Sequence, residues 1–389
     1  MNKILGYSII VFIIFVATGS SALSNNKVLI TGGWVTFLIA YLYTVKTIQY
    51  YFLGILGIFV AVSGLYFIKN GGYDPVTYLG FLIQVTLAYF CREICKEAFF
   101  KYFTNIVFVM TCITIPLFVV QLINFDFLYN INGLLGISSE GEFLSSSFFF
   151  ALAPIHETRN CGFMWEPGAF AAVLVVTIYI NTFHIGENIF SLKNSIFILA
   201  IVTTQSTMGF IALLVPVGLV VQKAIAENEK MRQISLVLIP ILIVFFVVIF
   251  SKLDFLSAKM VEQVRDIDEE LAFVEEGIKS NFVVSTTRLA SILIDMQTIK
   301  NYPLLGIGVD MRTTGLSKIG SGELTITACG LTNLLMRFGF LGLIAYTVLF
   351  YRSALFEDKL HKIGWVVLIF IILTSNELTA TSFLHLFIF

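Results

Sequence analysis

Long apolar runs, separated by short polar stretches, make up most of this 389-residue chain. A helix needs about 20 apolar residues to cross the hydrocarbon core of a bilayer. By that measure the pattern predicts eleven membrane-spanning helices, at 4–22, 28–45, 50–68, 75–91, 103–124, 167–185, 191–206, 207–222, 233–250, 328–350 and 363–379. We therefore expect an all-α integral membrane protein, a polytopic helical bundle of about 11 transmembrane helices (range about 10–12).

Polar residues interrupt two of these apolar stretches. Thr203–Gly209 divides a nearly continuous run from 191 to 222, and we expect a tight hairpin or a bend there, because polar groups and a glycine break a helix at membrane depth. The last span is interrupted at 374–377. The remaining segment, 381–389, is too short to cross, so we expect it to be re-entrant.

One long segment, Ser251–Thr327, is too polar for a bilayer to hold. It divides the chain into a transmembrane bundle at 1–250 with an outer loop at 125–167, a long outer loop at 251–327, and C-terminal transmembrane helices at 328–389. Ordering so long a polar loop costs conformational entropy, so we expect it to act on a substrate.

Two helices are predicted inside the long loop. Apolar residues recur every three or four positions from Leu256 to Ile278, which predicts an amphipathic helix across the outer face of the bundle. The acidic side of this helix is typical of a solvated surface, and Arg265 is the candidate functional residue on it. A second helix opens near Arg288 and ends before Pro303, where a glycine-containing turn follows.

Basic residues predict the orientation of the bundle. With the N-terminus inside, the inner segments hold twelve Lys or Arg residues, whereas the short outer loops hold three, Lys27, Lys69 and Arg159. This fourfold bias predicts a cytoplasmic N-terminus and places the long loop outside. Residues 1–22 resemble a cleaved signal peptide in length, but a retained first helix also fits the bias.

Composition limits the class further. The chain is 58% hydrophobic and 13% charged, against about 25% charged in soluble domains, which indicates a membrane protein and excludes a nucleic-acid binder. Cys91 and Cys95 have no His or further Cys nearby, so they make a poor metal site and are expected to be isolated thiols. Cys161 and Cys329 both fall on the outer side, where pairing is open.

The most pointed motif ends the outer loop at 125–167. It runs from Glu157 through Arg159 and Gly162 to Glu166-Pro167, and it opens a predicted span. Pro167 suits a first helical turn, and the helix dipole stabilises a carboxylate at Glu166. Two interpretations fit the motif equally well. Arg159 and Glu166 are functional groups at the membrane surface, or Glu166 only caps the helix and Arg159 only anchors the chain at lipid headgroups.

Two further arginines are unusual for their positions. Arg288 stands at a helix N-terminus, where its charge opposes the helix dipole. An anion such as a phosphate bound at the same N-terminus would explain this position. Simple exposure of Arg288 to solvent explains it about as well. Arg337 falls inside a predicted span, where a cation needs a partner or a water-filled cavity, and Glu377 is a candidate partner.

Together these motifs resemble the Wzy-type O-antigen and capsular polysaccharide polymerases and the related O-antigen ligases. The resemblance rests, in order along 155–350, on Arg159-x-x-Gly162-x-x-x-Glu166-Pro167, the break Thr204–Gly209, Arg288 leading into Pro303–Gly308, and the span containing Gly339–Gly342. It implies a GT-C-like fold, a location in the bacterial inner membrane, and undecaprenyl-pyrophosphate-linked oligosaccharides as substrates. A chain-length regulator and a flippase are the implied protein partners.

The resemblance also implies a chemistry. The leaving group is a pyrophosphate and the family is thought to use no metal, so arginines must stabilise the departing charge. The leading candidates are Arg159 and Arg288. Substrate-binding candidates behind them are Arg265, Arg312 and Arg337. A general base must accept the proton of the acceptor hydroxyl, and the candidates are Glu166, which leads on position, Glu157, Asp310 and His156.

Departures from the family pattern affect the choice among functions. The ligases resemble one another in having a His in the long outer loop, and Ser251–Thr327 has none, which favours a polymerase. The strict Arg-x10-Gly signature of some polymerases is absent, because Phe170 and Ile299 stand where its glycine would follow Arg159 and Arg288. The alternatives are an O-antigen ligase acting on lipid A–core and a lipid-linked glycan transporter, which would show internal repeats.

Overall fold

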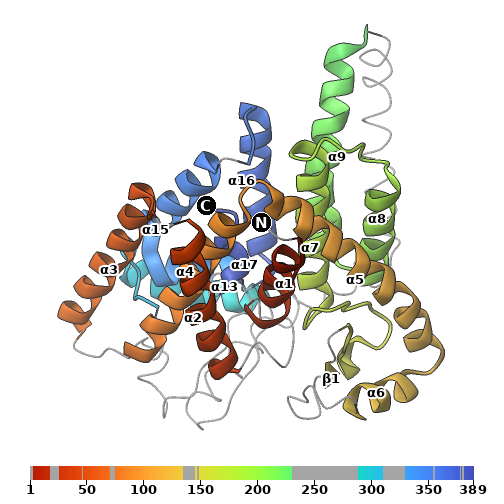
Figure 1. The fold of residues 1–389 in the computed structure, drawn as a ribbon, viewed down its shortest axis with the longest axis horizontal. Helices are drawn as coiled ribbons and strands as arrows, with labels where there is room; N and C mark the ends of the chain where they lie inside the picture. The colour runs from red at the N-terminus through yellow and green to blue at the C-terminus, as the bar shows by residue number, and fades with distance from the viewer. Residues whose placement is uncertain are drawn as a thin grey trace.

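The computed structural model describes residues 3–17, 26–45, 47–70, 75–134, 145–146, 149–229, 288–309, 329–353, 355–376, 378 and 381–389. This part of the chain is mostly helical (Figure 1). Its helices before the long loop are α1 (Lys3–Phe12) with the π-helical turn η1 (Ile13–Ala17), α2 (Lys27–Thr44), α3 (Tyr50–Asn70), α4 (Pro75–Cys95), α5 (Ala98–Ile123), α6 (Phe125–Leu134), α7 (Pro167–Phe183), α8 (Leu192–Thr204) and α9 (Thr207–Glu227). After it come α13 (Arg288–Asn301), α15 (Gly330–Arg352), α16 (Lys359–Leu373) and α17 (Ser382–His385).

Ten of the eleven predicted segments coincide, in whole or in part, with these helices. Among the described residues, five helices are long and apolar enough to cross a membrane: Lys27–Thr44, Val76–Cys95, Ala98–Ile123, Thr207–Glu227 and Gly330–Arg352. The predicted span at 233–250 and the amphipathic helix at 256–278 lie outside the described residues.

The described residues are mostly helical, as expected for an all-α membrane protein, with one short pair of strands besides. A two-residue antiparallel ladder pairs β1 (Ser145–Ser146) with β2 (Ala151–Leu152), and α6 precedes it within the predicted outer loop. Phe150 and Leu152 are buried with Phe118 and Leu128 in a small apolar cluster, so the described ends of this loop pack against α5 and α6. Buried backbone N–H and C=O groups need hydrogen-bond partners, and the ladder and α6 supply them in this part of the chain.

The buried centre of one half of the bundle is α7. Its residues from Pro167 to Asn181 are all buried, as expected for a helix that is apolar on every side. It packs against α8 and α9, which stand beside it on the right of Figure 1, and against α5. Gly209 allows α9 to approach closely, because a Cβ there would lie 2.6 Å from that of Ala171.

Contacts between helices define two ends of the bundle. Late in α7, Tyr179 donates to the carbonyl of His361 near the start of α16. At the other end of α16, the Asn376 carbonyl packs against Gly330, where α15 starts. The starts of α7, α9 and α15 therefore lie at one end, which we call the Arg159 end. The turn between α4 and α5 lies at the opposite end, since the Phe100 ring packs against His184 just after α7; this is the Arg92 end.

The segment predicted to be re-entrant folds back into the bundle. Residues 382–389 are all buried, and α17 packs against α4. Ser382 donates to the carbonyl of Gln84, and the Nη2 of Arg92 donates to the Phe389 carbonyl at 3.3 Å. Figure 1 shows α17 in the middle of the molecule.

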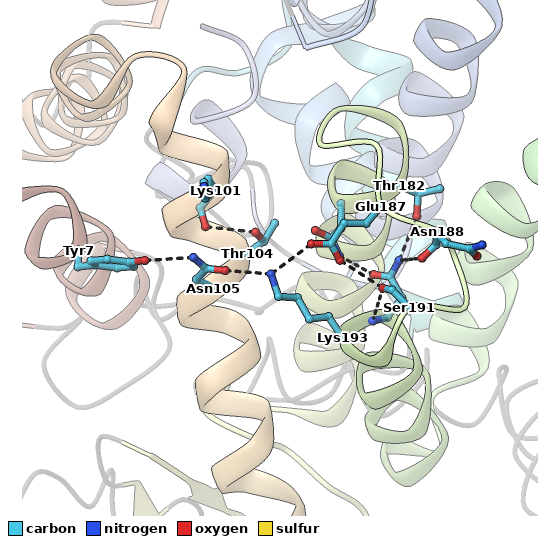
Figure 2. A network of polar contacts seen from close by, with 11 residues as sticks. Tyr7, Lys101, Thr104, Asn105, Thr182, Glu187, Asn188, Ser191 and Lys193 are labelled. Atoms are coloured by element: carbon cyan, nitrogen blue, oxygen red, sulfur yellow. Dashed lines mark hydrogen bonds and ion pairs between the residues drawn. The ribbon is translucent and has the colours of Figure 1, made fainter. Parts of the chain in front are cut away.

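A polar network fastens α1, α5 and α8 together (Figure 2). Lys193 forms an ion pair with Glu187 at 3.3 Å and donates to Asn105 Oδ1 at 3.1 Å. Asn105 in turn donates to the Tyr7 hydroxyl, and Asn181 donates to Glu187. Because Lys193 and Glu187 pair with each other and with neighbouring amides, the helices pack there without leaving either charge without a partner.

Candidate functional site

The segment carrying the Arg159 motif is pinned to two helices. The side-chain amide of Gln121, at the end of α5, donates to the carbonyls of His156, Glu157 and Arg159, at 3.1, 2.7 and 3.2 Å. On the other side, Asn160 bonds through its backbone N–H and its side-chain amide to Thr203. These bonds hold the loop across the break between α8 and α9.

The break itself confirms the prediction at Thr203–Gly209. Helix α8 ends at Gln205, which adopts a left-handed conformation with φ 49°, and Ser206 then caps α9 by accepting from the Gly209 N–H. Ser and Thr are preferred N-caps because their oxygens satisfy an N–H that has no partner in the first turn. Two weak motifs, far apart in sequence, therefore form one structural unit.

Arg159 has a role that sequence reasoning missed. Its Nε donates to the Thr204 carbonyl at 3.1 Å and its Nη2 to the Gln205 carbonyl at 3.4 Å. A cation at a helix C-terminus is favourable because it meets the negative end of the dipole. The half-buried guanidinium thus caps α8, and any ligand must use the rest of its donor surface.

Glu166 occupies the N-cap position of α7 but does not act as a cap. Its backbone is extended and its side chain accepts no hydrogen bond from the first turn, although Pro167 follows as predicted. Glu166 and Arg159 both lie close enough to Cys161 to influence its thiol in opposite directions. Burial is the largest influence and raises the pKa of Cys161 to about 12. Arg159 and Glu166 are therefore both near one buried thiol.

A second unit forms where the turn after α13 meets α15. The N–H groups of Ile307 and Gly308 donate to the carbonyls of Met336 and Arg337, at 2.7 and 2.9 Å. In return, the N–H groups of Phe340 and Leu341 donate to the carbonyls of Pro303 and Leu304, at 2.8 and 3.1 Å. Non-helical backbone at membrane depth is tolerated only where other protein groups satisfy it, and this interlock does so.

Two glycines make the interlock possible. Gly339 has φ 63° and ψ −167° and breaks α15. A Cβ on it would lie 2.3 Å from the Leu304 carbonyl oxygen, and one on Gly306 would lie 2.2 Å from that of Met336. Each glycine thus faces the backbone of the other segment, so the Pro303–Gly308 turn and the Gly339 break require one another.

Buried polar residues gather beside the interlock. Asp295 on α13 is fully buried and accepts a hydrogen bond from Thr332 on α15. Asn333 and Arg337, one helical turn apart on α15, are also buried. Sequence reasoning selected Arg337 but missed Asp295. The available signal was its place between Ile292 and Ile299 on the apolar side of the helix, since an acid there is costly unless it has a use.

The remaining candidate residues lie on the pinned loop, at the start of α13 or outside the described residues. His156 is half-buried and Glu157 is exposed, both on the pinned loop. Arg288 begins α13 as predicted, and the structure describes its backbone alone. Arg265, Asp310, Arg312 and Glu377 lie outside the described residues. Cys161 and Cys329 are both buried free thiols, so the open question of their pairing is answered against a disulfide. Within the described residues, no three His, Cys, Asp or Glu side chains are placed to hold a metal.

An apolar groove of about 400 Å³ adjoins the interlock. It runs between α3 and α15, and Leu305 of the turn and Phe338 beside the break form part of its lining. Among the other lining residues are Ile55, Ile58, Phe59 and Gly342. Ile58 and Leu341 are more than half exposed, so the groove opens outward from the bundle.

Comparisons with protein-family models and with curated proteins find no match to this chain. The fold itself defines a mostly helical protein with five helices suited to a membrane among its described residues. Among the described residues, the Arg159 loop and the interlock both lie at the Arg159 end, and in each of them polar groups meet a break in a helix.

Proposed function

We propose that this chain is a glycosyltransferase of the O-antigen polymerase type. It joins undecaprenyl-pyrophosphate-linked oligosaccharide repeat units into a long O-antigen or capsular polysaccharide. In this proposal the chain crosses the bacterial inner membrane about 11 times in a GT-C-like arrangement. Its Arg159 end then faces the periplasm, where a flippase would deliver the repeat units and a chain-length regulator would act.

The observation that carries the proposal is the pairing of the motifs behind the resemblance. The Arg159–Pro167 motif lies against the Thr204–Gly209 break, joined by Arg159 and Asn160. The Pro303–Gly308 motif lies against the Gly339 break, joined by four backbone hydrogen bonds. Each motif is weak alone, and nothing in their sequence spacing requires them to meet. Their meeting in two pairs at one end supports a shared site.

The apolar groove supports a lipid-linked substrate. Hydrocarbon chains are held by apolar surface, and this groove borders the interlock on the side that opens toward the bilayer. A polyprenyl chain lying there would bring its pyrophosphate toward the polar residues at the start of α15. Arg337, next to Phe338 of the groove, is the nearest arginine in sequence to that lining.

The proposed reaction is a displacement at the anomeric carbon of the donor glycan. The hydroxyl oxygen of an acceptor repeat unit bonds to that carbon, and the bond from carbon to the pyrophosphate oxygen breaks. The electron pair leaves with undecaprenyl pyrophosphate, and the hydroxyl proton passes to a general base, for which Glu166 is the first choice. Arg159 and Arg288 stabilise the departing pyrophosphate without a metal, because planar guanidinium groups bind phosphates bidentately.

Variants of Arg159 and Glu166 test this assignment. In a strain lacking its own copy, Arg159→Ala should remove long polymer, since one lost charge-stabilising group lowers the rate about 10²–10³-fold. Arg159→Lys should lose nearly as much if two-point geometry matters. Because Arg159 also caps α8, membrane accumulation and thermal unfolding are measured for each variant.

The control is Arg352→Ala, which removes an exposed arginine at the Arg92 end. Glu166→Gln keeps the size of the side chain, has no cap to lose, and should abolish polymer while the protein accumulates. Full-length polymer from both Arg159→Ala and Glu166→Gln would contradict the proposed site.

A further inference from the structure

The Arg92 end holds a hollow that the proposed reaction does not use. It measures about 750 Å³ and lies where α4 turns into α5. Its charged and polar lining comprises Thr47, Gln49, Arg92, Glu93, Lys96, Glu97 and His184. Small-molecule sites usually measure roughly 300–1,000 Å³, so this hollow has the size of a ligand site.

Arg92 is the most constrained group in it. Its guanidinium stacks over Phe100 at 4.3 Å, and it donates from Nη1 to the Lys96 carbonyl and from Nη2 to the Phe389 carbonyl. Its Nε is buried and has no acceptor among the described residues. A buried donor without an acceptor is costly, and so few occur that each one calls for an explanation.

The hollow combines both signs of charge. Arg92 and Lys96 supply two cations, whereas Glu93 and Glu97 supply two carboxylates, and Gln49 occupies one oxygen of Glu93 at 2.9 Å. A purely anionic ligand would meet the carboxylates, and a purely cationic one would meet the guanidinium. A ligand with a phosphate and an ammonium group would find a partner for each of its charges.

The surroundings place the hollow at the level of lipid headgroups. Tyr43, Tyr50 and Tyr51 are exposed by 82%, 91% and 46% next to the lining residues Val45 and Gln49. Exposed tyrosines gather at the membrane–water interface because their rings are apolar and their hydroxyls are wet. The apolar ends of α2 and α3 therefore flank the polar hollow, as the chains and headgroup of one lipid would require.

We propose that this hollow binds the headgroup of an ethanolamine phospholipid. The lipid phosphate pairs with the Arg92 guanidinium and the ammonium of Lys96, and the ethanolamine ammonium bonds to Glu97 and Glu93. His184 also lines the hollow, where its Nδ1 donates to the Leu355 carbonyl at 2.7 Å. The site is independent of the proposed glycosyl transfer and lies at the opposite end of the bundle.

The test uses the purified full chain in detergent. Dioleoyl phosphatidylethanolamine, phosphatidylcholine and phosphatidylglycerol are added separately, and bound lipid is counted by native mass spectrometry alongside thermal unfolding. We expect ethanolamine lipid to bind about tenfold or more tightly than choline lipid, which has the same phosphate but no N–H donor. Equal binding of all three lipids, or of none, would overturn the proposal.

Two variants localise the binding without disturbing Arg92. Lys96 has φ 49°, a conformation that Asn tolerates, so Lys96→Asn removes the charge without backbone strain. Glu97→Gln removes the carboxylate at an exposed position. Each should weaken ethanolamine-lipid binding about tenfold. The controls Glu357→Gln and Lys359→Gln remove exposed charges at the same end and should change nothing.

Two outcomes would refute the site even if ethanolamine lipid binds. Unchanged binding in both Lys96→Asn and Glu97→Gln would place the lipid elsewhere. The same stabilisation by soluble phosphoethanolamine would identify a free small molecule in place of a membrane lipid. Selective binding that both variants lose and both controls keep is the result that we expect.

Discussion

Replacing Gly339 by alanine tests whether the interlock, and not ordinary helix packing, holds α13 and α15 together. In the native chain Gly339 adopts φ 63° and ψ −167°, a conformation that L-residues other than glycine rarely adopt. The new Cβ would also lie 2.3 Å from the Leu304 carbonyl oxygen and 2.6 Å from the Leu305 nitrogen. Neither atom belongs to a flexible side chain, so the two backbones must move apart.

The magnitude follows from two contributions. The conformational strain of a non-glycine residue there is about 1–3 kcal/mol. Moving the segments apart also breaks the hydrogen bonds from Phe340 to Pro303 and from Leu341 to Leu304, at about 0.5–1.5 kcal/mol each. Together we expect Gly339→Ala to destabilise the fold by roughly 2–6 kcal/mol, a large share of the 5–15 kcal/mol typical of proteins.

The assay is thermal unfolding of the purified protein, with Gly57→Ala as the matched control. Gly57 lies in α3 and a Cβ there meets nothing within 4 Å, so alanine should leave stability unchanged or raise it by up to about 1 kcal/mol. Gly306→Ala should behave like Gly339→Ala because it faces the same backbone from the other side. If Gly339→Ala is as stable as Gly57→Ala, the interlock does not hold α13 and α15 together as we argue.

Three further outcomes follow from the contacts. Gln121→Ala removes the donor to three carbonyls and should destabilise the protein by about 1–3 kcal/mol. Gln121→Glu should not restore the stability, because its carboxylate has no N–H to donate, and a comparison of melting temperatures tests both variants. Lys193 forms a partly exposed ion pair with Glu187, so a double-mutant cycle of Lys193→Met and Glu187→Gln in denaturant unfolding should give a coupling of only about 0.2–1 kcal/mol. Asp358 accepts from the N–H of His361, and that bond lowers its pKa, so Asp358→Ala should be less stable than the native chain at neutral pH. The difference should vanish as pH falls through the lowered pKa, and a difference that persists in strong acid would contradict the cause.

Helices were predictable where their causes are local. The apolar runs and the polar patch at Thr203–Gly209 are visible in sequence, and the boundaries of α7, α8 and α9 follow them within a few residues. Pro167 and Ser206 begin their helices for reasons that lie within one turn. In such cases propensity, capping and hydropathy point to the same answer.

The break in α15 was not predictable in the same way. Gly339 and Gly342 look like tolerated glycines in an apolar helix, because nothing local forces a break. The cause is the Pro303–Gly308 turn, about 30 residues earlier, which supplies the hydrogen bonds that the broken helix lacks. The same reasoning applies to Arg159, whose capping of α8 depends on where α8 happens to end.

The site residues also differ in how far the local sequence predicts their roles. Arg159 and Glu166 were selected from their motif, and the structure places both beside Cys161. Glu166 was equally consistent with a simple cap, and the absence of a cap bond removes that alternative. Asp295 was missed because the helix pattern was read for its apolar residues. Its burial against Thr332 makes it a residue to test beside Arg337.

The measurement that tests the central claim most directly is a product assay. Purified protein is given the undecaprenyl-pyrophosphate-linked repeat unit with EDTA present, and the products are separated by length on a gel. We expect a ladder of polymer lengths from the native protein and none from Glu166→Gln. A single unlengthened unit, even after a metal is added back, would contradict the proposed polymerase; transfer to lipid A–core in the same assay would then identify a ligase instead.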